Sequence, residues 1–402
     1  MTNWYRGGDE WGMVWGNDKA IKLECRSLEY QSCLPCGMLF PENAQELDRN
    51  QPSRKKPMFP VIPRLRAYLK EHGREVKLPI EYKDLLNFTW STPVLDRLGR
   101  NTYWESVSYD MREWEYLREG LVQTYAVLKT EGDFSFVNHL DVARIDYCAF
   151  GNSHPFRIRI VNKFNDNYDH YYVKVADGSR IYGLELEHLL SPNRITFLIH
   201  GNTLVEEHIA GIPGDVFIDR YLKDPTTNKI RFAKEFVKFN ERCFVKLLGD
   251  MRSYNFVVNI TPDIEDYQYR IRAIDFDQQS YEGRLKLYKP QFFKENYQIV
   301  EMTLGLLNND SIKQYQAEER TMMAFRVVAS RYRLMALLDI MGQDMVSTQE
   351  KVQQICSELS AYTGNNVYRK CRNMGQVVKT HLKNLLRKSL VVVPRVTSRY
   401  ED

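Results

Sequence analysis

The sequence has no long run of apolar residues and no recognisable targeting segment. None of its hydrophobic stretches approaches the roughly eighteen consecutive apolar residues that a membrane-spanning helix needs. The first residues, MTNWYRGGDEWGMVWGNDK, lack the basic start and continuous apolar segment of a secretory signal peptide. We therefore expect a cytoplasmic protein without a membrane span.

The sequence is also poor in cysteine and in net charge. Seven cysteines, an odd number, are scattered over 402 residues, which favours a reduced protein over a disulfide framework. Cys25, Cys33 and Cys36 cluster, but no nearby Cys or His pair supplies a fourth zinc ligand, so buried or surface thiols are favoured over zinc. A net charge of +4 is small for this length and does not indicate a nucleic-acid-binding protein.

What is present is enough apolar material for a large core. Hydrophobic residues make up 43% of the chain and aromatic residues 12%, which argues against disorder. The length favours two domains, or one core with large additions. From the change in pattern along the chain we expect three regions: an accessory region of unknown role at 1–136, a β-rich region at 137–212 and a helical region at 213–402.

The β-rich region has a readable order of elements. The runs DVARIDYCAF, FRIRIVNKF and DHYYVKVA predict three consecutive antiparallel strands. The segment DGSRIYGLELEHLL predicts a short helix with Asp177 or Ser179 as its N-cap, and RITFLIHG and NTLVEEHI predict a hairpin. The amphipathic run KIRFAKEFVKFNERCFVKLL then predicts a long helix.

Two short motifs after that helix place oxygen ligands near β-structure. GDMRSYN contains Asp250 and Asn255, and AIDFD contains Asp275 and Asp277. Mg²⁺ takes few protein oxygens, so one aspartate and one asparagine suffice to hold it, while a further carboxylate can orient or deprotonate an acceptor hydroxyl. The alternative is a polar turn that leads into a β-hairpin.

This order of elements and motifs resembles the protein-kinase-like superfamily over about residues 140–300. The chain is most similar to atypical branches such as the aminoglycoside phosphotransferase-like small-molecule kinases. The resemblance implies an α+β, bilobal fold with a β-rich N-lobe and a helical C-lobe. It implies that Asp250 is the catalytic carboxylate and that Asn255 and Asp275 bind magnesium, with Asp277 either a second metal ligand or a solvated acid.

The resemblance also implies a nucleotide site. Lys174, in YYVKVAD, corresponds to the lysine near the α- and β-phosphates of ATP, and GLELEHLL supplies its partner, Glu185 or, as second choice, Glu187. The main chain of the hinge strand would bond adenine at Glu207, His208 and Ile209.

The match departs from the family at several positions. Leu248 stands where the family often has histidine, and Gly249 where protein kinases have arginine. The turn AFGNSHPF has a single glycine, so Ser153 and His154 either contact phosphate or form a simple β-turn.

The resemblance implies an ATP- and Mg²⁺-dependent transferase that moves the γ-phosphoryl group to a hydroxyl of an unidentified protein or small-molecule acceptor. Two alternatives stay open: a pseudokinase that acts as a scaffold, and an enzyme of the same fold that transfers AMP.

The last feature is a basic segment near the C-terminus. Residues 367–389 contain seven Lys or Arg and no acid. One interpretation is a patch for nucleic acid or an anionic membrane. The favoured one is a helix whose apolar face packs on the body through Val377, Val378, Leu382, Leu385 and Leu386.

Overall fold

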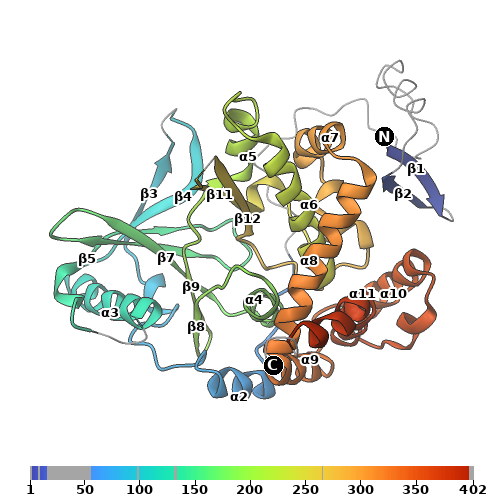
Figure 1. Ribbon diagram of the computed structural model, residues 1–402. Helices are drawn as coiled ribbons and strands as arrows, with labels where there is room; N and C mark the ends of the chain where they lie inside the picture. Colours follow the sequence, from blue (N-terminus) through green and yellow to red (C-terminus); the bar gives the residue numbers. More distant parts are fainter. Residues whose placement is uncertain are drawn as a thin grey trace, which may run out of the picture.

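The chain folds into a mixed α+β structure with an antiparallel sheet and a helical C-terminal part (Figure 1). Main chain alone is described for 2–7, 10–15 and 392–397. The computed structural model describes residues 2–7, 10–15, 56–96, 99–130, 134–264 and 266–397. Cys25, Cys33 and Cys36, considered above for zinc, lie outside these residues.

Seven strands form one antiparallel sheet in the order β3-β4-β5-β6-β7-β9-β8. The strands predicted between 140 and 207 are confirmed, including the β8–β9 hairpin with its two-residue turn at Gly201. The bounds are β3 (Trp90–Leu95), β4 (Asn101–Ser108), β5 (Leu140–Tyr147), β6 (Phe156–Asn162), β7 (Tyr168–Val175), β8 (Phe197–His200) and β9 (Thr203–Glu207).

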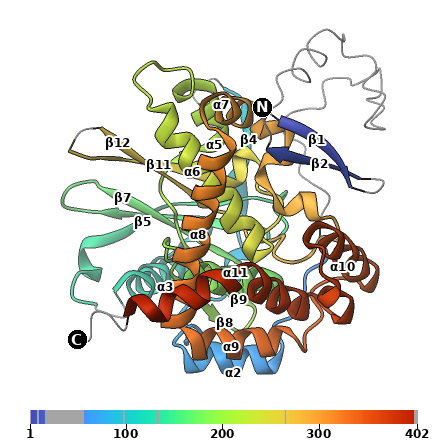
Figure 2. The same cartoon turned by 45° about the vertical axis from the view of Figure 1, so that its right-hand side comes forward.

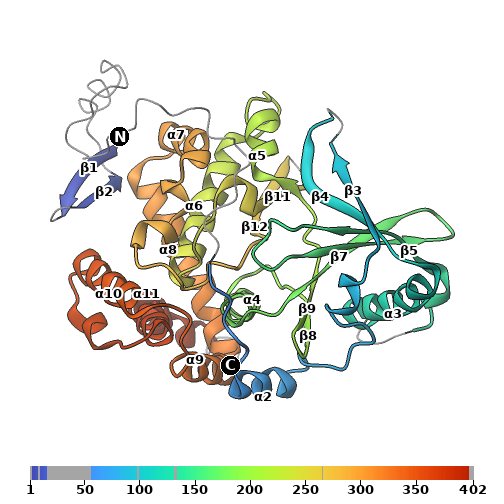
Figure 3. The same ribbon diagram turned by 180° about the vertical axis from the view of Figure 1, so that it is seen from behind.

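The sheet has a hydrophobic core on each face. Successive side chains of a strand point to opposite faces, and β8 shows this alternation: Phe197 and Ile199 join one core, whereas Leu198 joins the other. In β9, Leu204 and Val205 divide in the same way. Helix α3 (Met111–Thr130) covers one face, and helix α4 (Gly178–Leu190) lies on the other, between the sheet and the helical part (Figure 3).

The domain boundary expected between residues 136 and 137 needs correction, because the sheet crosses it. Strands β3 and β4 precede the boundary, yet β4 pairs with β5 at Glu105–Tyr147 and Ser106–Asp146. Residues 90–130 therefore belong with the β-rich part. Sequence patterning missed β3 because most of its side chains are exposed, so it lacks the alternation of a half-buried strand.

The helical part follows β9. A three-stranded antiparallel sheet of β10, β11 and β12 lies beside it, and β1 (Thr2–Gly7) pairs with β2 (Glu10–Trp15) in a separate hairpin. The remaining bounds are α2 (Pro63–Glu71), β10 (Ile212–Pro213), α5 (Gly214–Val216), α6 (Lys229–Lys246), β11 (Phe256–Pro262), β12 (Tyr267–Ala273), α7 (Tyr297–Leu306), α8 (Asn309–Ala329), α9 (Arg331–Met341), α10 (Gln349–Thr363) and α11 (Met374–Thr397).

The basic C-terminal segment forms part of α11, which lies across α8 and α9 (Figure 2). Val377, Val378, Leu382 and Leu386 are buried, and Leu385 packs against the same core. The predicted packing of this face is confirmed. Among the described helices, none is both long enough and apolar enough to cross a bilayer.

The contact between α9 and α11 depends on a residue without a side chain. Gly375 lies in the first turn of α11, where a Cβ atom would approach Met341 O at the end of α9 to 2.1 Å. We expect Gly375→Ala to separate the helices and lower the free energy of unfolding by about 2 kcal/mol, measured by urea denaturation. Gly305→Ala in α7 is the control, because a Cβ atom added there would have no neighbour within 4 Å. Equal effects of the two substitutions would contradict close packing as the cause.

Candidate functional site

Two loops that carry the predicted metal and catalytic residues lie side by side. The first follows α6 and contains Asp250 and Asn255; the second follows β12 and contains Asp275 and Asp277. Main-chain hydrogen bonds join them, from Ile274 N to Asn255 O (3.0 Å), Gly249 N to Gln278 O (3.2 Å) and Ser280 N to Leu247 O (2.9 Å). The structure therefore brings these four predicted residues to one region.

Asp250 is held in an unusual main-chain conformation. Its φ of 57° lies in the left-handed region, which costs free energy for a residue other than glycine. Two groups stabilise this turn at Asp250 O: Arg252 N at 2.9 Å and Asn255 Nδ2 at 2.7 Å. Because Asn255 donates through its nitrogen, its side-chain oxygen stays available to another partner.

The Asp250 carboxylate is largely buried and has one cationic partner. Arg252 Nε donates to Asp250 Oδ1 at 2.8 Å, and the same guanidinium contacts Glu295 at 2.8 Å. Burial raises the pKa of the Asp250 carboxyl, and Arg252 only partly offsets that rise. A carboxylate with a raised pKa is a better proton acceptor than an exposed one.

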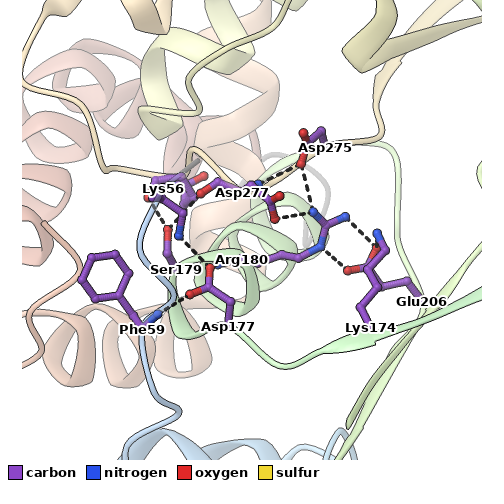
Figure 4. A network of polar contacts seen from close by, with 10 residues as sticks. Lys56, Phe59, Lys174, Asp177, Ser179, Arg180, Glu206, Asp275 and Asp277 are labelled. Atoms are coloured by element: carbon purple, nitrogen blue, oxygen red, sulfur yellow. Dashed lines mark hydrogen bonds and ion pairs between the residues drawn. The ribbon is translucent and has the colours of Figure 1, made fainter. Parts of the chain in front are cut away.

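A buried arginine that the sequence did not indicate connects the second loop to the sheet (Figure 4). Arg180, in the first turn of α4, donates from one nitrogen, Nη1, to Asp275 Oδ1 at 2.9 Å and to Asp277 Oδ1 at 2.6 Å. Its other two nitrogens bond both oxygens of Glu206 in β9. The guanidinium thus bridges three carboxylates.

Lys174 joins the same network from β7. Its Nζ lies 2.7 Å from Glu206 Oε2, and both side chains are almost fully buried. In the antiparallel register Glu206 pairs with Tyr172, so Lys174 and Glu206 are diagonal neighbours on one face of the sheet. The partner of Lys174 therefore comes from the adjacent strand.

The expected pairing of Lys174 with Glu185 or Glu187 is wrong. Glu185 is five residues beyond Arg180, about 140° around the helix, and points toward α2 and α9. There it accepts hydrogen bonds from three side chains: Tyr68, Arg74 and Arg333.

Glu187 does lie on the same side of α4 as Arg180, but two turns further along the helix. It forms a buried ion pair with Lys246 of α6. Both glutamates of α4 are therefore engaged away from the candidate site.

The start of α4 is fixed by the segment that precedes α2. Asp177, one of the two N-caps that the sequence allowed, is the N-cap and accepts from Arg180 N at 3.2 Å. Lys56 Nζ and Phe59 N also donate to the Asp177 carboxylate, at 2.8 and 2.6 Å. Gly183 lets the second loop approach α4, since a Cβ there would lie 3.1 Å from Phe276 and Gln279. These contacts position Arg180 rigidly.

The charges in this network do not balance. Two cations, Lys174 and Arg180, face three carboxylates, those of Glu206, Asp275 and Asp277. One negative charge remains, on the side of the network where Asp275 is 34% exposed and Asp277 is 12% exposed. A bound cation would compensate this excess.

The pKa values also differ between the buried carboxylate, Glu206, and the partly exposed one, Asp275. Burial by itself raises the pKa of Glu206, but Arg180 and Lys174 outweigh it and hold that pKa at about 2. The pKa of Asp275 is instead raised to about 6, first by burial and then by the Asp277 carboxylate, although Arg180 opposes both. Burial and the charge of Arg180 lower the pKa of Lys174.

The oxygen ligands available here fit a magnesium ion. Asp275 and Asp277 each use Oδ1 for Arg180, and no described residue donates to either Oδ2 or to Asn255 Oδ1. Mg²⁺ usually takes one or two carboxylates and completes its shell with water and phosphate oxygens. Within the described ranges, no group of three or more His, Cys, Asp or Glu is placed to hold a metal, so an all-protein cage is absent there.

The predicted hinge residues lie at the end of β9. Glu207 is tied to Thr196 through both its main chain (3.1 Å) and its carboxylate (2.8 Å), so its side chain has a structural partner. His208 Nδ1 lies 3.2 Å from the hydroxyl of Tyr172. The main-chain amides of His208 and Ile209 donate to no described residue.

The β5–β6 turn folds back onto β7. Val175 N donates to Ser153 O at 3.2 Å, and Tyr82 donates to His154 O at 2.9 Å. His154 has a φ of 43°, and its buried Nδ1 has no partner among the described residues. The turn therefore lies beside the end of β7, at Val175, the residue that follows Lys174.

Sequence reasoning missed Arg180 and Glu206. Each had a weak signal, because a charged residue stands among apolar neighbours in a predicted buried element: Arg180 in SRIYGL and Glu206 in TLVEEH. A buried charge needs a partner, and the strand register would have suggested Glu206 for Lys174.

Comparison with known proteins adds no relative: no protein-family model and no curated protein matches this sequence. The class that the structure defines is a mixed α+β protein with an antiparallel sheet and a helical C-terminal part.

Proposed function

We propose that this protein is an ATP- and Mg²⁺-dependent phosphotransferase of the protein-kinase-like fold. It would have a β-rich nucleotide lobe and a helical lobe, and would transfer the γ-phosphoryl group to a hydroxyl of a protein or small-molecule acceptor. The order of elements supports this assignment: three antiparallel strands, helix α4, the β8–β9 hairpin, the long helix α6 and the two joined loops.

One observation carries the proposal. A continuous chain of contacts runs from Lys174 through Glu206 and Arg180 to Asp275, and the neighbouring Ile274 N bonds Asn255 in the loop of Asp250. A cation for phosphate, oxygens for a metal and a carboxylate for an acceptor are thus linked by direct contacts. Phosphoryl transfer needs mainly this positioning and charge stabilisation.

Each residue has a role that its surroundings support. Asp275 and Asn255 would hold Mg²⁺, with Asp277 as a second carboxylate; the ion would neutralise charge on the phosphates. Asp250, with its raised pKa, would orient the acceptor hydroxyl and take its proton. Lys174 would contribute positive charge toward the phosphates.

The hinge supports the same proposal. The free amides of His208 and Ile209 would bond the adenine ring, and Glu207 would stay in its structural contact with Thr196. Adenine offers ring nitrogens that accept hydrogen bonds from such amides.

A pseudokinase is the second candidate, and a specific observation favours it. Arg180 already supplies a cation to Asp275 and Asp277, and Lys174 is held by Glu206. With these contacts made, the acids have less need of a metal. This candidate predicts a scaffold that binds nucleotide weakly or not at all.

The test is incubation with Mg²⁺ and ATP labelled at either the γ- or the α-phosphate, with and without cell lysate as a source of acceptor. We expect γ-label, and no α-label, to move to the protein itself, to a lysate protein or to a soluble metabolite. Transfer of α-label would instead show that the enzyme transfers AMP.

A thermal-shift measurement distinguishes a pseudokinase from a phosphotransferase. A ligand that binds only the native state stabilises it by an amount that grows with the logarithm of its concentration above Kd. We expect Mg²⁺ and ATP together to raise Tm more than either alone. No label transfer and no shift at millimolar ATP would overturn the phosphotransferase proposal.

A further inference from the structure

A strongly basic pocket lies away from the candidate site. It has a volume of about 490 Å³ and opens where the end of α4, the following loop and the α8–α9 junction meet. Four arginines and no carboxylate contribute to its lining: Arg194, Arg326, Arg331 and Arg333. His188, Ser330 and Tyr332 add further polar and aromatic groups to the lining.

Three of these arginines form no salt bridge in the part of the chain that the structure describes, although the Glu319 carboxylate, which pairs with Arg242, acts on the charge of Arg326. Arg333 is neutralised by Glu185, with nitrogen–oxygen distances of 2.8 and 2.9 Å. Arg194, Arg326 and Arg331 form no ion pair with any described carboxylate. The lining residues thus carry a net positive charge.

Arg326 shows that this charge is unfavourable without a ligand. Its side chain is half-buried in the last turn of α8. Burial first, and then the nearby charge of Arg194, lower the pKa of Arg326, and the Glu319 carboxylate only partly opposes them. An anion between the two arginines would replace this repulsion with attraction.

The main chain offers further donors at the same place. The first hydrogen bond of α9 runs from Leu334 N to Ser330 O, at 2.9 Å. The three preceding amides, of residues 331–333, donate to no described residue, and no side chain caps the helix. The C-terminal end of α8 meets this point too, so the two helix dipoles oppose each other and the arginines provide the net positive charge.

His188 and Tyr332, two further residues of the lining, limit which ligands the pocket can bind. His188 Nδ1 lies 3.0 Å from Arg74 Nη2, and burial together with Arg74 lowers the pKa of His188 to about 4, so it adds no charge at neutral pH. Tyr332 is 90% exposed and provides an aromatic surface at the pocket.

We propose that this pocket binds a multiply charged phosphorylated small molecule, of the size of pyrophosphate or a nucleoside diphosphate. Guanidinium groups bond phosphate oxygens in pairs, and several arginines match a charge greater than that of one carboxylate. The volume lies in the range of small-molecule sites and exceeds the space that a single phosphate fills. The site is distinct from the network of Arg180 and does not depend on the proposed catalytic function.

The test is isothermal titration of inorganic pyrophosphate and of ADP, at low salt and with EDTA, so that metal-dependent binding at the first site does not contribute. We expect saturable binding of one pyrophosphate. The double variant Arg194→Gln/Arg326→Gln should weaken it about tenfold for each arginine removed, and added salt should weaken it in the wild type.

Arg112→Gln is the matched control, because it removes an exposed arginine of α3 that does not line the pocket. It should bind pyrophosphate as the wild type does. If the double variant does not fold, Arg331→Gln, which changes an exposed side chain, tests the same prediction alone. Tighter binding of ADP that Tyr332→Ala reduces to the level of pyrophosphate would support stacking of the base.

Three results would overturn the proposal: no saturable binding by the wild type, unchanged affinity in the double variant, or an equal loss in Arg112→Gln. The result is independent of the candidate site, because Asp275→Asn should leave pyrophosphate affinity in EDTA unchanged. Loss of phosphoryl transfer with retained pyrophosphate binding would therefore separate the two proposals.

Discussion

Asp275→Asn is expected to reduce Mg²⁺- and ATP-dependent phosphoryl transfer at least about 100-fold, since it removes a charged metal ligand. The asparagine oxygen can still accept the hydrogen bonds from Arg180 Nη1 and Asp277 N that Asp275 Oδ1 accepts now. The fold should therefore persist. The measurement is initial rate of γ-label transfer at saturating ATP, with Tm recorded on the same preparations.

The loss of activity in Asp275→Asn should not be accompanied by a loss of stability. The folded-state pKa of Asp275 is raised to about 6, above the usual value near 3.8, so ionisation is less favourable in the folded than in the unfolded chain. This group therefore reduces stability as pH rises through the interval from about 4 to 6, and the penalty persists above it. We expect metal-free Asp275→Asn at pH 8 to be no less stable than the wild type.

The same pKa sets the pH dependence of the wild type. Below about pH 6 a proton occupies Asp275 and competes with Mg²⁺, so the apparent metal affinity should fall as pH decreases. Asp310→Asn, which changes an exposed acid in the first turn of α8, is the matched control. Wild-type turnover in Asp275→Asn, or the same loss in Asp310→Asn, would remove Asp275 from the mechanism.

Arg180→Met is expected to lower the free energy of unfolding by about 3–5 kcal/mol at neutral pH. Methionine retains much of the side-chain length, but the carboxylates of Glu206, Asp275 and Asp277 then share a single cation, Lys174. Breaking a buried ionic network in this way leaves uncompensated charge. Urea denaturation at pH 7.5 measures the effect.

The pH dependence and Mg²⁺ identify the cause of this loss. Protonation of the carboxylates relieves their repulsion, so the difference between Arg180→Met and wild type should shrink as pH falls toward about 5. Mg²⁺ should raise the Tm of Arg180→Met more than that of the wild type, because the ion replaces a missing positive charge. Arg180→Lys, which keeps the charge and loses the paired hydrogen bonds, should fall between the two.

A loss that is independent of pH and of Mg²⁺ would attribute the effect to packing alone. Strong label transfer by Arg180→Met would show that Arg180 limits the activity of Asp275 and Asp277 and does not promote it. Absence of transfer with a large Mg²⁺-dependent rise in Tm would favour a role for Arg180 in positioning Asp275.

Local patterns were sufficient to predict most elements near the site. Alternating apolar residues predicted β5, β6 and β7, and the Asp177 cap and the glycine turn at 201 predicted α4 and the β8–β9 hairpin. These features are encoded within a few neighbouring residues, because hydrophobic period and capping chemistry act over one or two turns. Strand β3 lacked such a signal, since most of its side chains are exposed and pairing with β4 holds it.

The juxtaposition of Asp250, Asn255, Asp275 and Asp277 was expected from motif order, and the two loops do lie side by side. Their partners were not foreseeable in the same way. Lys174 is bonded by a residue 32 positions away, and Arg180 reaches carboxylates 26 to 97 positions away.

In the chain, then, neighbouring residues already specify where strands, caps and turns occur and which short motifs carry oxygen ligands. The pairing of each carboxylate with its cation depends on the strand register and on the angular position of each residue around α4. Both are set by packing between distant segments. Glu185 and Glu206 are both glutamates, yet their partners differ. Glu185 pairs with Arg74 and Arg333. Glu206 pairs with Lys174 and Arg180. Long-range packing distinguishes them, because the free energy of a buried charge depends on the partner brought to it by the fold.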